Sequence, residues 1–319
     1  MGINIGKAQW RLLQVSPCAC RPASSSITQR RLYFIRVMIP LFRFFSCFPL
    51  WVAHAVGWAC GWGVFAASGV YRRRFLANAR QAGMAWRQWR GAVGAAGQLV
   101  AELPRLWFGR PVAVQWDGAE HIDAALAHGR GVVFLTPHLG CFEVTAQAYA
   151  RRFGQPDKLG QPMTVLYRPP RKAWLNALVT TARSRPGLAT APTTLAGVKQ
   201  LIKALKQGQC VGLLPDQVPP MGLGLWVPFF GREAYTMTLS TRLAQQTGAT
   251  ILIAWGERLA WGRGYHVHVK PLPTGLPADA TQAAAVVNLA MEGLVRACPQ
   301  QYLWGYARYK QPRQEAGQR

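Results

Sequence analysis

From Pro111 onward the sequence alternates short apolar runs with longer amphipathic segments. Short apolar runs bounded by turn residues are typical of buried strands, and the segments between them repeat apolar residues at helical spacing. This alternation predicts an α/β fold, with a mixed, largely parallel sheet flanked by helices. The predicted strands have the sequences VAVQW, GVVFL, MTVLY, CVGLLP, ATILIAW and GYHVHVK.

Helices are predicted in the segments between these strands. Gly248 is expected to end one of them, because glycine readily adopts the backbone conformation that follows a helix. The Pro/Gly-rich segment VPPMGLGLW is expected to be a flexible loop that returns at VPFFG. The predicted helices span 140–153, 172–183, 236–247 and 279–297, together with the sequences AEHIDAALAHG and TLAGVKQLIKALKQG.

The first 37 residues differ from the rest of the chain. They hold six basic residues, no acidic residue, and Pro/Ser-rich stretches without an apolar period. Such a composition predicts disorder. Met38 is an alternative start, in which case residues 1–37 are not translated.

An uncharged stretch follows, from Phe44 to Tyr71. As a helix, residues 50–70 would rise roughly 31 Å, about the hydrocarbon thickness of a bilayer. We therefore predict a membrane-anchor helix region at 38–74, with the basic residues 72–74 as its cytoplasmic flank. A helix lying in the membrane interface and a buried soluble helix are the two alternatives.

The remaining boundaries follow from composition. Residues 75–110 read as a basic, helical, membrane-proximal segment with tryptophans among arginines. Residues 111–310 form the predicted α/β domain, and residues 311–319 form a tail.

The chain carries 37 basic and 12 acidic residues, a formal net charge of +25. This charge favours an anionic partner: a nucleic acid, a phospholipid surface, or an acidic protein or substrate. The seven cysteines are scattered, odd in number and without paired CxxC spacing. They are interpreted as reduced thiols in a cytoplasm-facing protein, with no structural zinc site.

One candidate catalytic pair lies in TPHLGCFE. His138 follows a buried run and therefore lies at the carboxyl end of a strand, where open α/β sheets place their sites. Glu143 falls in the first turns of the next helix. Its carboxylate is expected to reach back to the imidazole and orient it as a general base. Cys141, between them, is a weaker candidate for a covalent acyl carrier.

Further candidates end other strands on the same edge. Asp216 follows the run CVGLLP, and Arg168 follows MTVLY. Arg183 and Arg185 lie on or after the next helix. If these arginines converge on one cleft, they form an anion site for a phosphate or a phosphopantetheine arm.

Two histidines lie on the last predicted strand. The alternation in GYHVHVK places His266 and His268 on one face of it. They are interpreted as surface strand residues rather than metal ligands, so no metal and no cofactor are expected.

Taken together, several motifs in order resemble the secondary (late) acyltransferases of lipid A biosynthesis, the lauroyl/myristoyl acyltransferase family of the lysophospholipid-acyltransferase-like superfamily. The resemblance runs from about Ile39 to about Lys310 and begins with the anchor region. The motifs are the His, four residues, Glu spacing in PHLGCFE, then LYRPP, RSR at 183–185, LLPDQ, VPFFG and QYLWGYARYK.

The resemblance implies a glycerol-3-phosphate-acyltransferase-like fold and a bacterial inner-membrane enzyme with a cytoplasmic catalytic domain. Such an enzyme moves an acyl chain from acyl carrier protein, an acidic co-substrate, to a hydroxyl of a Kdo-bearing lipid A precursor. Carried over by motif, His138 is the base and Glu143 its partner. Arg183 and Asp216 are essential site residues, and Arg168 is a less certain substrate-binding residue. Anionic inner-membrane lipids are the expected surroundings.

Two other functions remain open. One is an acyltransferase acting on another lipid, such as a lysophospholipid, an ornithine lipid or an aryl polyene type product. The other is a membrane-tethered basic nucleic-acid-binding protein. It is disfavoured because the arginines are spread along the chain and no reading motif occurs, so no nucleic acid partner is expected.

Overall fold

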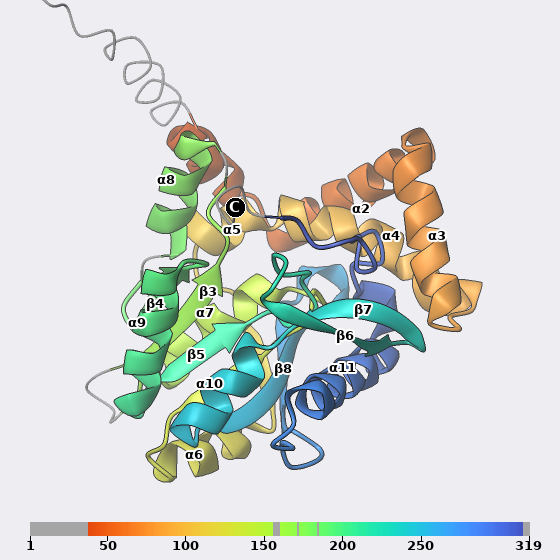
Figure 1. Cartoon of the computed structure of the whole chain (residues 1–319). Coiled ribbons are helices and arrows are strands. Elements are labelled where there is room, and N and C mark those ends of the chain that lie inside the picture. Colours follow the sequence, from red (N-terminus) through yellow and green to blue (C-terminus); the bar gives the residue numbers. More distant parts are fainter. Residues whose placement is uncertain (1–37, 156–159, 171, 184, 315–319) are drawn as a thin grey trace, which may run out of the picture.

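The computed structural model describes residues 38–155, 160–170, 172–183 and 185–314 (Figure 1). The predictions for residues 1–37 and for the last five residues fall outside these ranges. The description below concerns the described residues only.

The centre of the molecule is a seven-stranded sheet in the order β1-β9-β8-β2-β5-β3-β4. All neighbouring strands run parallel except β8 and β9, which are antiparallel. The prediction of a mixed, largely parallel sheet flanked by helices is therefore confirmed. The strands are β1 (Val114–Asp117), β2 (Val132–Leu135), β3 (Met163–Tyr167), β4 (Leu188–Pro192), β5 (Cys210–Leu213), β8 (Thr250–Arg258) and β9 (Tyr265–Pro271).

Helices cover both faces of the sheet because its central strands are apolar on both sides. On β2, Val132 and Phe134 belong to one core cluster, whereas Val133 and Leu135 belong to the other. The first cluster packs α6 (Ala119–Ala127), α7 (Phe142–Arg152) and α8 (Ala173–Arg183). The second packs α9 (Leu195–Lys206), α10 (Leu239–Thr247) and α11 (Ala280–Ala297).

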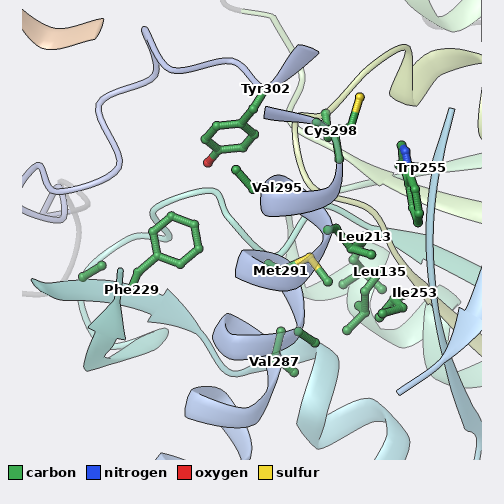
Figure 2. Close-up of a cluster of buried hydrophobic side chains, with 14 of the residues drawn as sticks. Leu135, Leu213, Phe229, Ile253, Trp255, Val287, Met291, Val295, Cys298 and Tyr302 are labelled. Atoms are coloured by element: carbon green, nitrogen blue, oxygen red, sulfur yellow. The ribbon is translucent and has the colours of Figure 1, made fainter. Parts of the chain in front are cut away.

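Figure 2 shows part of the second cluster. Leu135, Leu213 and Ile253 project from three adjacent strands toward Met291 and Val295 of α11. Each of these side chains is almost completely buried. The carboxyl ends of β2 and β5 are thereby fixed side by side, which matters for the site described below.

Two parts of the chain differ from the sequence-based expectation. The segment expected to be a flexible loop, residues 218–226, ends in strand β6 (Gly224–Phe229), which forms a hairpin with β7 (Arg232–Met237). Both turn residues, Phe230 and Gly231, have positive φ, as a two-residue hairpin turn requires. The helix expected from 236 begins only at Leu239, because the preceding residues pair in β7. Strand β4 was not expected at all.

The amino-terminal helices are α2 (Leu50–Ala67), α3 (Gly69–Gln81), α4 (Trp86–Ala101) and α5 (Leu103–Phe108), and residues 38–46 are also helical. The helix considered over 50–70 is interrupted at Ser68, whose hydroxyl accepts a hydrogen bond from the Tyr71 amide and caps α3. By length and composition, α2 is the one helix among the described residues that is long and apolar enough to cross a membrane.

Helix α2 packs closely against α4 through glycines. A Cβ placed on Gly97 of α4 would lie 1.9 Å from the Gly57 carbonyl oxygen and 2.6 Å from the Gly61 nitrogen. A Cβ on Gly61 would lie 2.3 Å from the Val93 carbonyl oxygen. The two backbones therefore approach as closely as in small-residue helix pairs.

Gly97→Ala is expected to destabilise the protein by at least about 1–3 kcal/mol, because the clash is with backbone that cannot rotate away. The matched control is Gly63→Ala on α2, where nothing lies within 4 Å of the added Cβ. That change is expected to be neutral or stabilising through helix propensity. Thermal unfolding in detergent measures both, and equal stabilities of the two variants would contradict the close packing.

Candidate active site

His138 lies in the loop that follows β2, and backbone hydrogen bonds hold this loop in place. The amide of Thr136 donates to the Leu213 carbonyl at 3.0 Å, and the amide of Leu303 donates to the His138 carbonyl at 2.9 Å. Gly140 has a positive φ of +58° and forms an isolated β-bridge with Gly256. A side chain at Gly140 would strike the Gly256 carbonyl, so only glycine allows this approach.

The imidazole of His138 is paired with Asp216, which follows β5. Nδ1 lies 2.8 Å from Asp216 Oδ1, and the His138 amide donates to Oδ2 of the same carboxylate at 2.9 Å. Both side chains are buried, Asp216 almost completely. One carboxylate thus fixes both the ring and the backbone of His138.

This carboxylate is ionised at neutral pH. Burial alone would raise the pKa of Asp216, but the charge of His138, its two hydrogen bonds and the charge of Arg308 outweigh burial and hold the pKa below its ordinary value. An ionised Asp216 accepts a hydrogen bond from Nδ1, so the ring proton is on Nδ1 and Nε2 is left as the basic nitrogen. This is the tautomer that a general base requires.

Aromatic rings and one amide complete the surroundings of the imidazole. Tyr306 stacks on it at 5.5 Å with an interplanar angle of 10°, and Phe142 meets it edge-on at 5.2 Å. The Gln217 amide nitrogen lies 3.1 Å from Nε2 and donates to it. The Tyr302 hydroxyl lies 3.4 Å from Asp216 Oδ2. The ring nitrogen that faces away from Asp216 is therefore Nε2, beside Gln217.

Glu143 is placed differently from the expectation. Its Oε1 accepts from Nε of Arg183 at 2.9 Å and its Oε2 accepts from Nη2 at 2.7 Å, while the Trp107 indole also donates to Oε1 at 2.9 Å. The expected contact with the imidazole is replaced by this two-pronged ion pair, and Asp216 occupies the position beside Nδ1. The reason is geometric, because Glu143 lies on α7 facing α8 rather than the loop.

The three arginines do not converge on one cleft. Arg183 is neutralised by Glu143, and Arg185 donates to the backbone carbonyls of Leu106 and Trp107. Arg168 is exposed and lines a cavity of about 380 Å³. The expected three-arginine anion site is therefore reduced to Arg168.

This cavity reaches the imidazole through Gln217. Its walls are mainly apolar, and its polar groups lie where β3, β4 and β5 end, near the His138 loop. The lining includes Leu166, Thr194, Val218, Met221, Leu223 and Leu239. An extended chain with one anionic or polar end fits such a lining.

Cys141 is not a nucleophile in this arrangement. Its side chain is fully buried, and burial together with the neighbouring Glu102 carboxylate raises the pKa of its thiol well above the ordinary value. A protonated, enclosed thiol cannot receive an acyl group.

A second buried carboxylate, Glu102, supports the loop that carries His138 through a network of hydrogen bonds. It accepts two hydrogen bonds from Arg258 at 2.8 and 2.6 Å, one from the Tyr265 hydroxyl at 2.9 Å, and pairs with His54 at 3.1 Å. Arg258 in turn donates to the Gly140 carbonyl at 2.9 Å. The network joins α2, the start of α5, β8 and β9 to the loop that carries His138.

Sequence reasoning missed Gln217, Tyr306 and Glu102. The first two lie inside quoted motifs, LLPDQ and QYLWGYARYK, so their place in the motifs was a usable signal. Glu102 had a weaker one: it is a lone acid in a largely apolar helical stretch of a chain with 12 acidic residues. A lone acid in such a stretch indicates a buried carboxylate, which needs a cation as its partner.

Comparison with known proteins gives one family match. A family model described as bacterial lipid A biosynthesis acyltransferase matches residues 91–311. The lipid A biosynthesis palmitoleoyltransferase of Escherichia coli (strain K12) is 29% identical over 219 residues, 67% of this chain and 68% of the relative.

Two further relatives from Escherichia coli (strain K12) are similar. The lipid A biosynthesis lauroyltransferase is 31% identical over 195 residues, 60% of each chain. The lipid A biosynthesis myristoyltransferase is 25% identical over 194 residues, 60% of this chain and 57% of the relative. The three names differ in the acyl group and share lipid A.

Replacing Glu102 tests the network behind the loop. Glu102→Gln is expected to lower the free energy of unfolding by about 3–5 kcal/mol, because it leaves the Arg258 cation buried without a counter-charge. Asp123→Asn, which neutralises an exposed acid on α6, is the matched control and is expected to change stability by under about 0.5 kcal/mol. Denaturant unfolding in detergent compares the two, and similar losses in both would contradict the role of Glu102.

The same pair predicts a pH dependence. Burial would raise the pKa of Glu102, but the Arg258 charge and the hydrogen bonds from His54 and Arg258 lower it from 4.5 to about 2. A depressed folded-state pKa contributes stability that is present above the unfolded value and lost as the pH falls. The stability difference between wild type and Glu102→Gln is therefore expected to shrink between pH 4.5 and about 2. A constant difference across this window would contradict the assignment.

Proposed function

The chain belongs to the bacterial lipid A biosynthesis acyltransferase family, and on that premise we propose that it moves a fatty acyl chain from acyl carrier protein to a hydroxyl of a Kdo-bearing lipid A precursor. Family membership supports acyl transfer onto lipid A. The observation that carries the finer proposal is the buried His138–Asp216 pair beside the cavity of about 380 Å³.

In this proposal His138 is the general base. The acceptor hydroxyl takes the position of the Gln217 amide at Nε2 and gives its proton to that nitrogen as its oxygen attacks the thioester carbonyl. A C–O bond forms, the tetrahedral intermediate collapses, and the C–S bond breaks. The imidazolium then returns the proton to the leaving thiolate, so no acyl-enzyme is formed.

Asp216 is the orienting acid in this mechanism. It holds the proton on Nδ1 and stabilises the imidazolium that appears during the reaction. This role was expected of Glu143. The bidentate pair of Glu143 with Arg183 instead supports the packing of α7 on α8.

Gln217 is proposed to contribute to the oxyanion site. Its amide donor already points at Nε2 from 3.1 Å. Once the acceptor hydroxyl takes that position, the donor lies beside the reacting carbonyl and can stabilise the negative charge that develops on its oxygen. The mainly apolar cavity beyond Gln217 would take the acyl chain, with Arg168 at its edge toward the phosphate of the phosphopantetheine arm.

Membrane association is proposed to occur through one apolar face, defined here as the anchor face, rather than by a crossing helix. Helix α2 buries His54 against Glu102 and packs Gly57 and Gly61 on α4, so one side of it is committed to the protein. Large apolar side chains elsewhere on this helix and next to it are exposed. The anchor face consists of Phe44, Phe45, Phe48, Trp51, Val56, Trp58, Val64 and Trp261.

A helix used in this way lies in the interface, with tryptophans at the headgroup level. Arg73 and Arg74 at the following helix are exposed and would contact anionic lipid. The net charge of +25 also suits an acidic acyl carrier protein.

Transfer of labelled acyl chains from acyl carrier protein to a Kdo-bearing lipid A precursor tests the reaction. His138→Ala is expected to lower the rate by about 10²–10⁴-fold. His128→Ala, which removes an exposed histidine just after α6, is the control and is expected to retain full activity. Full activity in a folded His138→Ala protein would refute the mechanism. Unchanged lipid A acylation in a deletion strain, measured by mass spectrometry, would redirect the proposal to another lipid.

Replacing Asp216 and Glu143 in turn tests which of the two carboxylates orients His138. Asp216→Asn is expected to lower the rate by about 10²–10⁴-fold and to add little to the loss in His138→Ala, because the two act as a unit. Glu143→Gln is expected to reduce stability more than the turnover of the folded fraction. The opposite ranking, with Glu143→Gln the slower enzyme and Asp216→Asn nearly normal, would restore Glu143 as the orienting acid.

Vesicle sedimentation tests the anchor face. The double change Trp51→Ala/Trp58→Ala is expected to weaken binding to anionic vesicles markedly, whereas Trp226→Ala, an exposed tryptophan on β6, is expected to leave it unchanged. An interfacial helix is expected to be extracted by alkaline carbonate. Wild-type protein that resists extraction would show a crossing helix instead.

A further inference from the structure

A group of polar side chains lies on the sheet at its β1 edge, away from the His138 loop. Glu257 is the second-last residue of β8, and Asp117 is the last residue of β1. His266 and His268 lie on β9. The strand registers bring them together: His266 is opposite Glu257, and His268 is opposite Asp117. Among the described residues, Glu257, His266 and His268 have ligand atoms that all lie within 4.8 Å of one another.

We propose that Glu257, His266 and His268 bind a divalent cation of the zinc class, with Asp117 as the group that orients His268. The sequence favoured surface residues over ligands for the two histidines. It placed them on one face, as the structure does, with ring centroids 4.1 Å apart. What the sequence could not show is the carboxylate facing each nitrogen of His268.

The contacts of His268 favour a cation. Its Nδ1 lies 3.1 Å from Asp117 Oδ2, and its Nε2 lies 3.0 Å from Glu257 Oε2. Both partners are carboxylates, which accept hydrogen bonds and do not donate them when ionised. A neutral imidazole has one N–H and satisfies only one of them. The second nitrogen therefore faces the other carboxylate through either an added proton or a metal ion.

The neighbouring groups favour a metal over a proton. His266 adds a third ligand at the same position, which a protonated His268 would not need. Neutral imidazole and carboxylate are ligands of zinc, at about 2.0–2.2 Å, so tetrahedral ligand atoms lie about 3.4 Å apart. The Glu257–His268 separation of 3.0 Å is close to that spacing.

Asp117 has the place of an outer carboxylate. A metal-binding histidine usually donates its other ring N–H to such a group, which fixes the tautomer and the ring orientation. Trp255 further fixes the ring of His268 by stacking on it at 4.3 Å with an interplanar angle of 13°. Two carboxylates offset the charge of a divalent ion. Bound there, the ion would tie the edge strand β1 to β8 and β9.

The test is zinc titration of the chelator-treated full chain in detergent, followed by calorimetry, with exposed thiols alkylated first because Cys47 and Cys60 are accessible. We expect one zinc ion per chain at this site and a higher melting temperature with zinc. His266→Ala/His268→Ala is expected to weaken binding at least about 100-fold, and Asp117→Asn about 10–100-fold. His128→Ala, which removes an exposed histidine that follows α6 and lies outside the group, is expected to bind zinc normally.

Cobalt substitution gives an independent readout. The bound cobalt is expected to show a tetrahedral spectrum without a thiolate charge-transfer band, and the band pattern is expected to vanish in the double variant. Equal zinc affinity in the double variant and wild type would overturn the proposal. So would a folded wild-type chain that binds no zinc, in which case His268 bridges the carboxylates as a protonated imidazole.

Discussion

The buried ion pair between Glu102 and Arg258 is the constraint on which the arrangement of this molecule depends. Glu102 is fully buried and Arg258 nearly so, so both charges have left water. Such a pair is stable only when hydrogen bonds satisfy the remaining polar atoms. Here the Tyr265 hydroxyl, His54 and the Gly140 carbonyl supply most of them, while Nη1 of Arg258 is buried without a hydrogen-bond partner among the described residues. Because these groups come from distant parts of the chain, those parts cannot shift independently without exposing a charge.

The sheet explains why the site lies where it does. Strands β2 and β5 are parallel and adjacent, so the residues that follow them emerge at one edge. His138 follows one strand and Asp216 the other, and a short turn is enough to bring imidazole and carboxylate within 2.8 Å. Glu143 is closer in sequence but lies on a helix that turns its side chain toward α8. Spatial order across a parallel sheet outweighed sequence proximity.

Sequence periodicity was enough to predict the mixed sheet, its six named strands and most helices that cover it. It revealed neither β4 nor the β6–β7 hairpin. In the segment that leads into the hairpin, Pro and Gly dominate locally, and the pairing of β6 with β7 depends on contacts with α11. The site was predicted as a set of residues but not as pairs. Which acid reaches His138 depends on strand order, and which arginine is neutralised depends on the packing of α7 on α8. One chain without a contact map carries neither kind of information.

The Glu102 network also bears on how a membrane-bound acceptor would meet the base. Helix α2 carries part of the anchor face and also His54, and His54, Glu102, Arg258 and the Gly140 carbonyl form a continuous path to the His138 loop. A base that must reach a hydroxyl on a lipid held in the bilayer has to keep a constant height above it, within the sub-ångström tolerance of proton transfer. Docking α2 through the buried His54–Glu102 hydrogen bond and through glycine contacts supplies that rigidity. A flexible tether would not, because its end-to-end distance fluctuates by several ångströms even for a few residues.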